Sequence, residues 1–94
     1  MSEQVGAGRA YRLASQVALE SFAEGGLLLR LTDRRLFELN PTALRILELS
    51  DGGRSAGEVA AALAAAFEID EEQALEDVLS LYDDFMEQGM VEIA

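Results

Sequence analysis

The N-terminal part of the chain alternates between apolar and polar positions with a period of two, which is typical of β-strands. A first run spans residues 16–23, and the following residues 24–26 (EGG) favour a tight turn because glycine tolerates positive φ. A second run spans residues 27–31 and a third spans residues 35–39, with polar residues between them. Three short runs joined by tight turns predict an antiparallel β-meander.

From residue 40 onward the apolar positions recur every three or four residues, which is typical of amphipathic helices. Asn40 followed by Pro41 predicts a helix start, because asparagine caps a helix well and proline suits the first helical position. We expect this first helix to end in the turn-forming residues 50–53 (SDGG).

Two capping boxes predict where the next helices begin. Ser55 and Glu58 open a second helix, and Asp70 and Gln73 open a third that runs to about residue 88. Gly89 then fits the left-handed position that commonly follows a helix.

This order of elements predicts an α+β fold: a three-stranded antiparallel β-meander followed by a three-helix, winged helix-turn-helix-like bundle. We expect residues 1–12 to form a flexible N-terminal tail, because this segment is small and polar. We expect residues 13–94 to form a single domain.

The sequence contains no cysteine and no histidine. A thiol nucleophile, a disulfide frame, a zinc site of the usual kind and a histidine general base are therefore excluded. We expect a protein that is not an enzyme and that needs no cofactor or metal.

The charge is unevenly distributed along the chain. Its seven basic residues are all arginine and lie within residues 1–54, where seven acidic residues balance them. Residues 55–94 carry eleven acidic residues and no basic one, which accounts for the net charge of −11. This acidic surface argues against nucleic acid as a partner, and it serves either solubility or the selection of a basic partner. No apolar run is long enough for a membrane span and no signal peptide precedes the domain, so we expect a cytoplasmic protein.

The third predicted helix has more apolar positions than one buried stripe requires. Val78, Leu81 and Phe85 form one stripe, and a second stripe contains Leu75, Leu79, Tyr82 and Met86. The first stripe is expected to meet the other helices. The second forms either a wide core contact or one wall of a groove, where the polar tip of Tyr82 would suit an edge position and Met86 would adapt to a partner.

The third predicted strand leaves one edge unpaired in a three-stranded meander. Arg34, Arg35 and Glu38 are charges that discourage promiscuous strand pairing at such an edge. The same edge is also able to accept one chosen peptide by β-augmentation. Protection and reception remain alternatives at this point.

Several local strings in this order resemble PqqD-like proteins. Residues 37–43 (FELNPTA) and 46–52 (ILELSDG) resemble the stretch in which that family has a Leu-Asn pair and then an Asp-Gly pair. Residues 59–63 (VAAAL) resemble a later helix of the family, and residues 77–91 resemble its ending. The resemblance covers about residues 15–93. The chain departs from the pattern at Met90, where leucine is commoner, and at Leu47, where an aromatic residue is absent.

The resemblance implies a peptide chaperone, or RiPP recognition element, that binds the leader of a ribosomally synthesised precursor peptide. It implies that the leader adds to the third strand as an antiparallel strand, between that strand and the third helix, and that a separate maturation enzyme receives it. That enzyme would be a lasso-peptide leader peptidase or a radical-SAM enzyme. The residues implied for peptide binding are Arg34, Arg35, Leu36, Phe37 and Glu38 on the strand, and Leu75, Leu79, Tyr82, Asp83 and Met86 on the helix.

Two other functions remain open from the sequence. A winged-helix DNA-binding regulator would fit the helices but needs a basic recognition helix, which residues 55–94 do not provide. A structural adaptor that dimerises through its sheet edge would also fit the meander.

Overall fold

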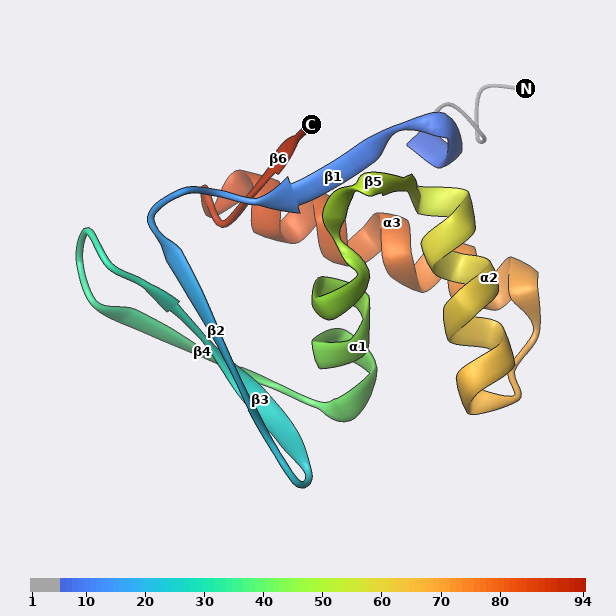
Figure 1. The fold of residues 1–94 in the computed structure, drawn as a ribbon, viewed down its shortest axis with the longest axis horizontal. Coiled ribbons are helices and arrows are strands. Elements are labelled where there is room, and N and C mark those ends of the chain that lie inside the picture. Colours follow the sequence, from blue (N-terminus) through green and yellow to red (C-terminus); the bar gives the residue numbers. More distant parts are fainter. Residues whose placement is uncertain (1–5) are drawn as a thin grey trace.

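The computed structural model describes residues 6–94, in which six strands and three helices follow one another (Figure 1). Their order is β1 (Ala10–Leu13), β2 (Val17–Phe22), β3 (Gly25–Arg30), β4 (Arg35–Leu39), α1 (Pro41–Leu49), β5 (Asp51–Ser55), α2 (Ala56–Phe67), α3 (Glu71–Glu87) and β6 (Val91–Ile93). The strands form two three-stranded antiparallel sheets, ordered β2-β3-β4 and β5-β1-β6.

The sheet β2-β3-β4 is the predicted meander, and β4 covers the predicted residues 35–39. Leu19, Leu28 and Phe37 lie side by side across the three strands. Leu28 is fully buried, and the other two pack against the core from the same face of the sheet. The period-two pattern therefore sets which face of the meander turns toward the helices.

The helix starts follow the predicted capping residues. The side chain of Asn40 accepts a hydrogen bond from the Ala43 amide at 2.8 Å, and Ser55 and Glu58 form a reciprocal capping box. The second predicted box forms only in part. Asp70 accepts from the backbone of α3, but the Gln73 side chain donates to Asp77 one turn further on instead of returning to the cap.

Two segments differ from the prediction. Residues 51–55, expected as a turn and a cap, form β5. Of the expected N-terminal tail, residues 1–5 lie outside the described part, but residues 10–12 belong to β1. β1 pairs with β5 on one edge and with β6 on the other, so its partners come from distant parts of the sequence. An assignment from local composition misses such a strand because the pairing is non-local.

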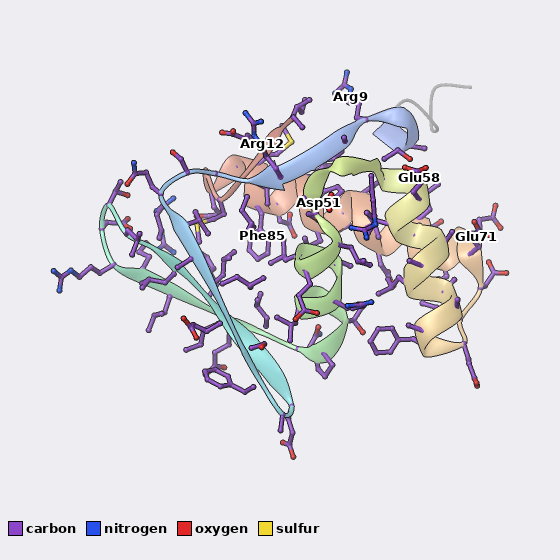
Figure 2. All side chains as sticks on the ribbon, viewed as in Figure 1. Arg9, Arg12, Asp51, Glu58, Glu71 and Phe85 are labelled. Atoms are coloured by element: carbon purple, nitrogen blue, oxygen red, sulfur yellow. The ribbon has the colours of Figure 1, made fainter. Side chains whose placement is uncertain are left out.

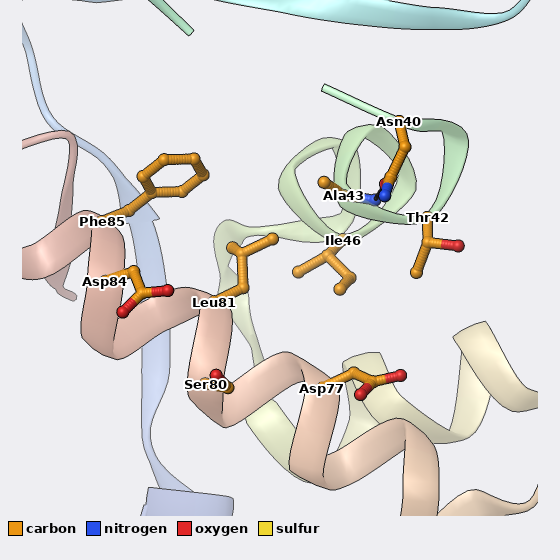
Figure 3. A pocket seen from close by; sticks show the side chains of 9 residues that line it. All are labelled: Asn40, Thr42, Ala43, Ile46, Asp77, Ser80, Leu81, Asp84 and Phe85. Atoms are coloured by element: carbon orange, nitrogen blue, oxygen red, sulfur yellow. Dashed lines mark hydrogen bonds between the residues drawn. The ribbon is translucent and has the colours of Figure 1, made fainter. Parts of the chain in front are cut away.

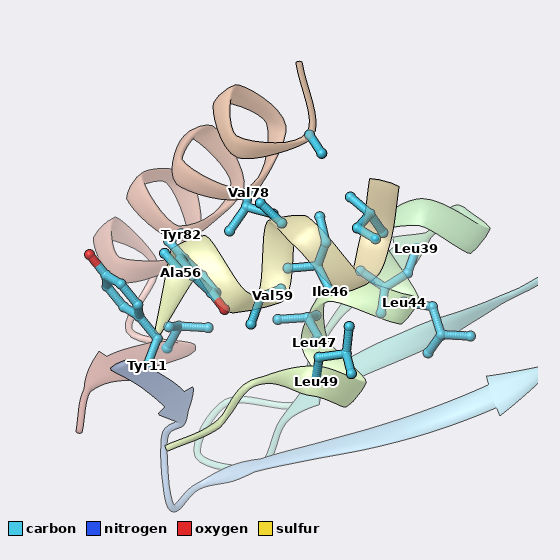
Figure 4. Packing of buried hydrophobic residues seen from close by; sticks show 14 of the residues in the cluster. Tyr11, Leu39, Leu44, Ile46, Leu47, Leu49, Ala56, Val59, Val78 and Tyr82 are labelled. Carbon is cyan, nitrogen blue, oxygen red and sulfur yellow. The ribbon is translucent and has the colours of Figure 1, made fainter. Parts of the chain in front are cut away.

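The hydrophobic core lies among the three helices and extends to β1 (Figure 4). Ile46 and Leu47 of α1, Leu63 of α2 and Val78 of α3 are almost fully buried. After α3, Gly89 adopts a φ of +73° and the Met90 amide donates to the Phe85 carbonyl at 2.8 Å. This is the predicted left-handed helix end, and it turns the chain into β6.

Candidate functional site: a cleft between two helices beside a free strand edge

A cleft of about 460 Å³ lies between α1 and α3 (Figure 3). One wall of the cleft consists of the capping residue Asn40 and residues of α1. The other wall consists of α3 residues that recur every three or four positions and so share one face of the helix. The lining residues are Asn40, Thr42, Ala43, Ile46, Asp77, Ser80, Leu81, Asp84 and Phe85. The cleft therefore combines an apolar wall with a polar rim.

The apolar wall comes chiefly from Leu81 and Phe85, which project from α3 toward the side on which α1 lies (Figure 3). The ring of Phe85 also meets the ring of Phe37 on β4 edge-on, with 5.8 Å between ring centroids. Phe85 thus links the cleft to the meander. Figure 2 also places its side chain on the inner side of α3.

The rim is acidic. Asp77 and Asp84 each contribute a carboxylate, and no arginine is among the described residues that line the cleft. Figure 2 shows Arg9 and Arg12 along β1 at the upper edge of the view, and neither lines the cleft. A basic group entering the cleft would therefore meet uncompensated negative charge, which favours its binding and orientation.

The edge of β4 that faces away from β3 carries no strand among the described residues. Along β4, Phe37 points inward with Leu28, while Leu36 and Glu38 point to the opposite face of the sheet. The guanidinium carbon of Arg35 lies 5.1 Å from the centroid of the Phe37 ring, close enough for a cation–π contact. β4 therefore offers free backbone donors and acceptors beside an aromatic side chain.

Arg30 connects the meander to the end of α3. Its guanidinium donates to both carboxylate oxygens of Asp33 and to the backbone carbonyl of Gln88 at the C-cap of α3. A cation at this end is favoured by the helix dipole. The hydrogen bonds from Arg30 also hold the pKa of Asp33 below its ordinary value. This contact ties the β3–β4 turn to the end of α3. It was not predicted from the sequence. An arginine on the inward face of the central strand was a usable signal for it.

Tyr82 was expected at the edge of a groove, and the structure corrects this expectation. Its side chain is 1% exposed, its ring stacks on Tyr11 of β1 with 4.1 Å between centroids, and its hydroxyl lies 2.6 Å from that of Ser50 (Figure 4). Ser50 donates to the Ile46 carbonyl, so Tyr82 is the donor in the Tyr82–Ser50 hydrogen bond. Burial raises the pKa of Tyr82 above its ordinary value. Tyr82 is a core residue because β1 covers it.

The other predicted residues of α3 also lie off the cleft. Leu75 and Leu79 are half-buried against the core, and Gly6 lies against Leu79. Asp83 and Met86 are exposed and do not line the cleft. Of the stripe assigned to the groove, Leu79 and Tyr82 are thus covered by the N-terminal segment.

The residues of α3 that do line the cleft include Leu81 and Phe85, which the sequence pattern assigned to contacts with other helices. Asp77, Ser80 and Asp84 flank these two residues at helical spacing. A polar border beside an apolar stripe is the signal that distinguishes a surface groove from a closed core contact.

The described residues show no group of three or more acidic side chains arranged to hold a metal ion. None of the helices in this part of the chain has the length and apolar character needed to cross a membrane.

The model of a known family, "Coenzyme PQQ synthesis protein D (PqqD)", matches residues 25–91 of the chain. This match confirms the resemblance to PqqD-like proteins that the sequence strings indicated. None of the curated proteins matches the chain.

Solved structures share the fold. A lasso peptide synthetase B1 complexed with its leader peptide is 27% identical, with a TM-score of 0.76 over 87% of this chain and 96% of that chain. TbiB1 in complex with the TbiA(beta) leader peptide is 20% identical, with a TM-score of 0.77 over 86% and 94%. The PqqD truncation of Methylobacterium extorquens PqqCD, described as a stand-alone RiPP recognition element, is 23% identical, with a TM-score of 0.77 over 98% and 99%. These likenesses confirm the predicted α+β fold.

Proposed function

Because this chain belongs to the PqqD family, we propose that it binds the leader segment of a ribosomally synthesised precursor peptide and presents it to a separate maturation enzyme. The observation that carries the proposal is the free edge of β4 beside an open, partly apolar cleft on α3. A related protein, the lasso peptide synthetase B1, has been solved with a leader peptide bound.

The leader adds alongside residues 34–38, which are Arg34 of the β3–β4 turn and the first four residues of β4, as an antiparallel strand. Main-chain hydrogen bonds to this edge supply sequence-independent affinity, and alternate side chains of the leader point toward the helices. Arg34, Arg35, Leu36, Phe37 and Glu38 thus act mainly through their backbone, while the Phe37 ring also contacts the peptide.

The helix wall of the site is formed by Leu81 and Phe85, in place of the stripe predicted from the sequence. An apolar leader side chain packs on these residues, because they are half-buried and open to the cleft. A basic leader residue pairs with Asp77 or Asp84 at the rim. This charge contact sets the orientation and the association rate more than the affinity.

The chain contains neither cysteine nor histidine, and we propose that it performs no chemistry on the peptide. The enzyme that acts is a separate protein, a leader peptidase or a radical-SAM enzyme. The acidic cleft disfavours the alternative of DNA binding, because a phosphate backbone needs a basic surface.

The test is a titration of the labelled chain with the leader encoded by the neighbouring precursor gene, followed by amide NMR. We expect chemical-shift changes concentrated in residues 34–39 and 77–85. Changes confined to α2 would overturn the proposal, since α2 lies outside the cleft. A duplex DNA of similar charge serves as the control ligand and is expected to cause no comparable changes.

A further inference from the structure

The outward face of the meander is apolar, although it turns away from the core. In the register of β2-β3-β4, the side chains on this face alternate with the core-facing ones. Phe22 and Leu36 are 58% and 59% exposed, and Leu27 and Leu29 on the central strand are half-buried without packing against the core. The apolar residues of this face are Ala18, Phe22, Leu27, Leu29 and Leu36. In the following paragraphs we refer to them as the outer patch.

A second hollow, of about 420 Å³, lies at the hairpin end of the outer patch. Its lining includes Phe22, Leu27, Glu24 and Glu38 around the backbone of Gly25 and Gly26. Gly25 pairs with Phe22 and has a φ of +145°, and a Cβ atom there would lie 2.3 Å from the Leu39 carbonyl oxygen. Glycine is therefore required at this position.

Carboxylates surround this hollow. Glu20 and Glu38 flank Leu27 in one cross-strand row, and Glu24 lies at the β2–β3 turn. All three are exposed, and within residues 6–94 none of them forms a salt bridge. The hollow thus combines an aromatic ring, an aliphatic side chain and uncompensated negative charge. An arginine or lysine side chain matches this combination, because its stem is apolar and its head is cationic.

We propose that the outer patch docks the enzyme that acts on the bound peptide, with an arginine or lysine of that enzyme inserted between Glu24 and Glu38. The inference rests on the proposed function, which requires such an enzyme. β4 separates the two sites: Phe37 points toward the helices and contacts Phe85 of the cleft, while Leu36 of the outer patch and Glu38 point to the opposite face of the sheet. Peptide and enzyme therefore bind at the same time, the peptide at the free edge of β4 and the enzyme on the outward face of the meander.

Charge also decides against a second copy of the chain as the occupant. Each copy carries a net charge of −11, and two outer patches facing each other would bring their glutamates together. Like charges across an interface cost free energy, whereas a basic partner gains from the same residues.

The test measures binding of the full chain to the maturation enzyme encoded beside it, by sedimentation velocity at two salt concentrations. Phe22→Ser removes the aromatic wall of the hollow, and Glu24→Arg reverses its charge. Each is expected to weaken the complex about 10-fold or more, and the wild-type complex is expected to weaken with salt. Phe67→Ser, on an exposed apolar residue at the end of α2, is the matched control and leaves binding unchanged.

Leader affinity, measured separately by titration, is expected to be the same in all four proteins, because neither Phe22 nor Glu24 lines the cleft. If the wild-type chain fails to bind the leader, the proposed function is wrong. The docking proposal is wrong if the wild type and both variants bind the enzyme equally well. It is also wrong if the wild-type chain does not bind the enzyme. Self-association of the chain alone that Phe22→Ser abolishes would identify a second copy as the occupant and also overturn it. Glu24→Arg, at an exposed turn, keeps the test valid if Phe22→Ser is unstable.

Discussion

The two apolar faces of α3 differ in what lies across from them. On one face, Tyr82 stacks on Tyr11 of β1 and donates a hydrogen bond to Ser50, and the half-buried Leu79 lies beside Gly6. On the other face, Leu81 and Phe85 border an open cleft whose opposite wall belongs to α1. The same helix therefore stabilises the fold with one face and leaves the other available to a ligand.

The difference is set by a segment far away in the sequence. β1 lies over the first face because it is held between β5 and β6, which precede and follow α2 and α3 in the chain. Within residues 6–94, no strand covers Phe85 in this way, and its ring makes only the edge-on aromatic contact with Phe37. A covered apolar face contributes to stability, whereas an uncovered one flanked by carboxylates is suited to binding.

The largest expected effect comes from breaking the covered face. Tyr82→Ala removes a fully buried ring together with its stacking on Tyr11, and it leaves the Ser50 hydroxyl without its buried partner. We expect a loss of about 3–5 kcal/mol in the free energy of unfolding, as for other buried aromatic residues. Urea denaturation followed by circular dichroism measures it. A loss below about 1 kcal/mol would mean that Tyr82 is not a core residue.

The elements predicted from the sequence are those with local signals. The capping residues Asn40 and Ser55 and the left-handed Gly89 each depend on neighbours within a few positions, and each occurs as predicted. The period-two pattern was also sufficient for β4, because it separates the two faces of a strand.

Where the side chains of α3 lie was harder to predict, because their surroundings depend on non-local contacts. Periodicity identified two stripes on α3 but carried no information on which one β1 covers. Tyr82, with a hydroxyl at the end of a large ring, fits both an exposed edge and a buried hydrogen-bonded position, and only the partner Ser50 decides between them. The polar border formed by Asp77 and Asp84 distinguishes the open face, and it is visible in the sequence once a groove is sought.

A second change separates the two faces by their effect on the ligand. Phe85→Ala removes the side chain that joins the cleft to Phe37, and we expect it to weaken leader binding by about 1–3 kcal/mol, the range of an interface anchor. Because Phe85 is only partly buried, the loss of stability is expected to be smaller than for Tyr82→Ala.

Isothermal titration calorimetry with the leader peptide measures the affinity of Phe85→Ala. Leu79→Ala is the matched control, since Leu79 is half-buried on the covered face. We expect this variant to lose stability but to bind the leader as wild type does. If Leu79→Ala weakens leader binding as much as Phe85→Ala does, the leader site does not lie on the face with Leu81 and Phe85.

The smallest expected effect is the loss of stability at alkaline pH through Tyr82 on the covered face. Burial raises the pKa of Tyr82 in the folded state, so the folded chain holds the phenolic proton more tightly than the unfolded chain. The contribution of this proton to stability is complete below the unfolded pKa of about 10 and is lost as pH rises through the higher folded pKa. Tyr82→Phe keeps the ring and removes the titrating group, at a cost of about 1 kcal/mol for the hydrogen bond to Ser50. Urea denaturation between pH values of about 8 and 11 should therefore show that the free energy of unfolding falls more steeply with pH for wild type than for Tyr82→Phe. If the free energies of the two proteins fall in parallel, the Tyr82 hydroxyl is in contact with solvent.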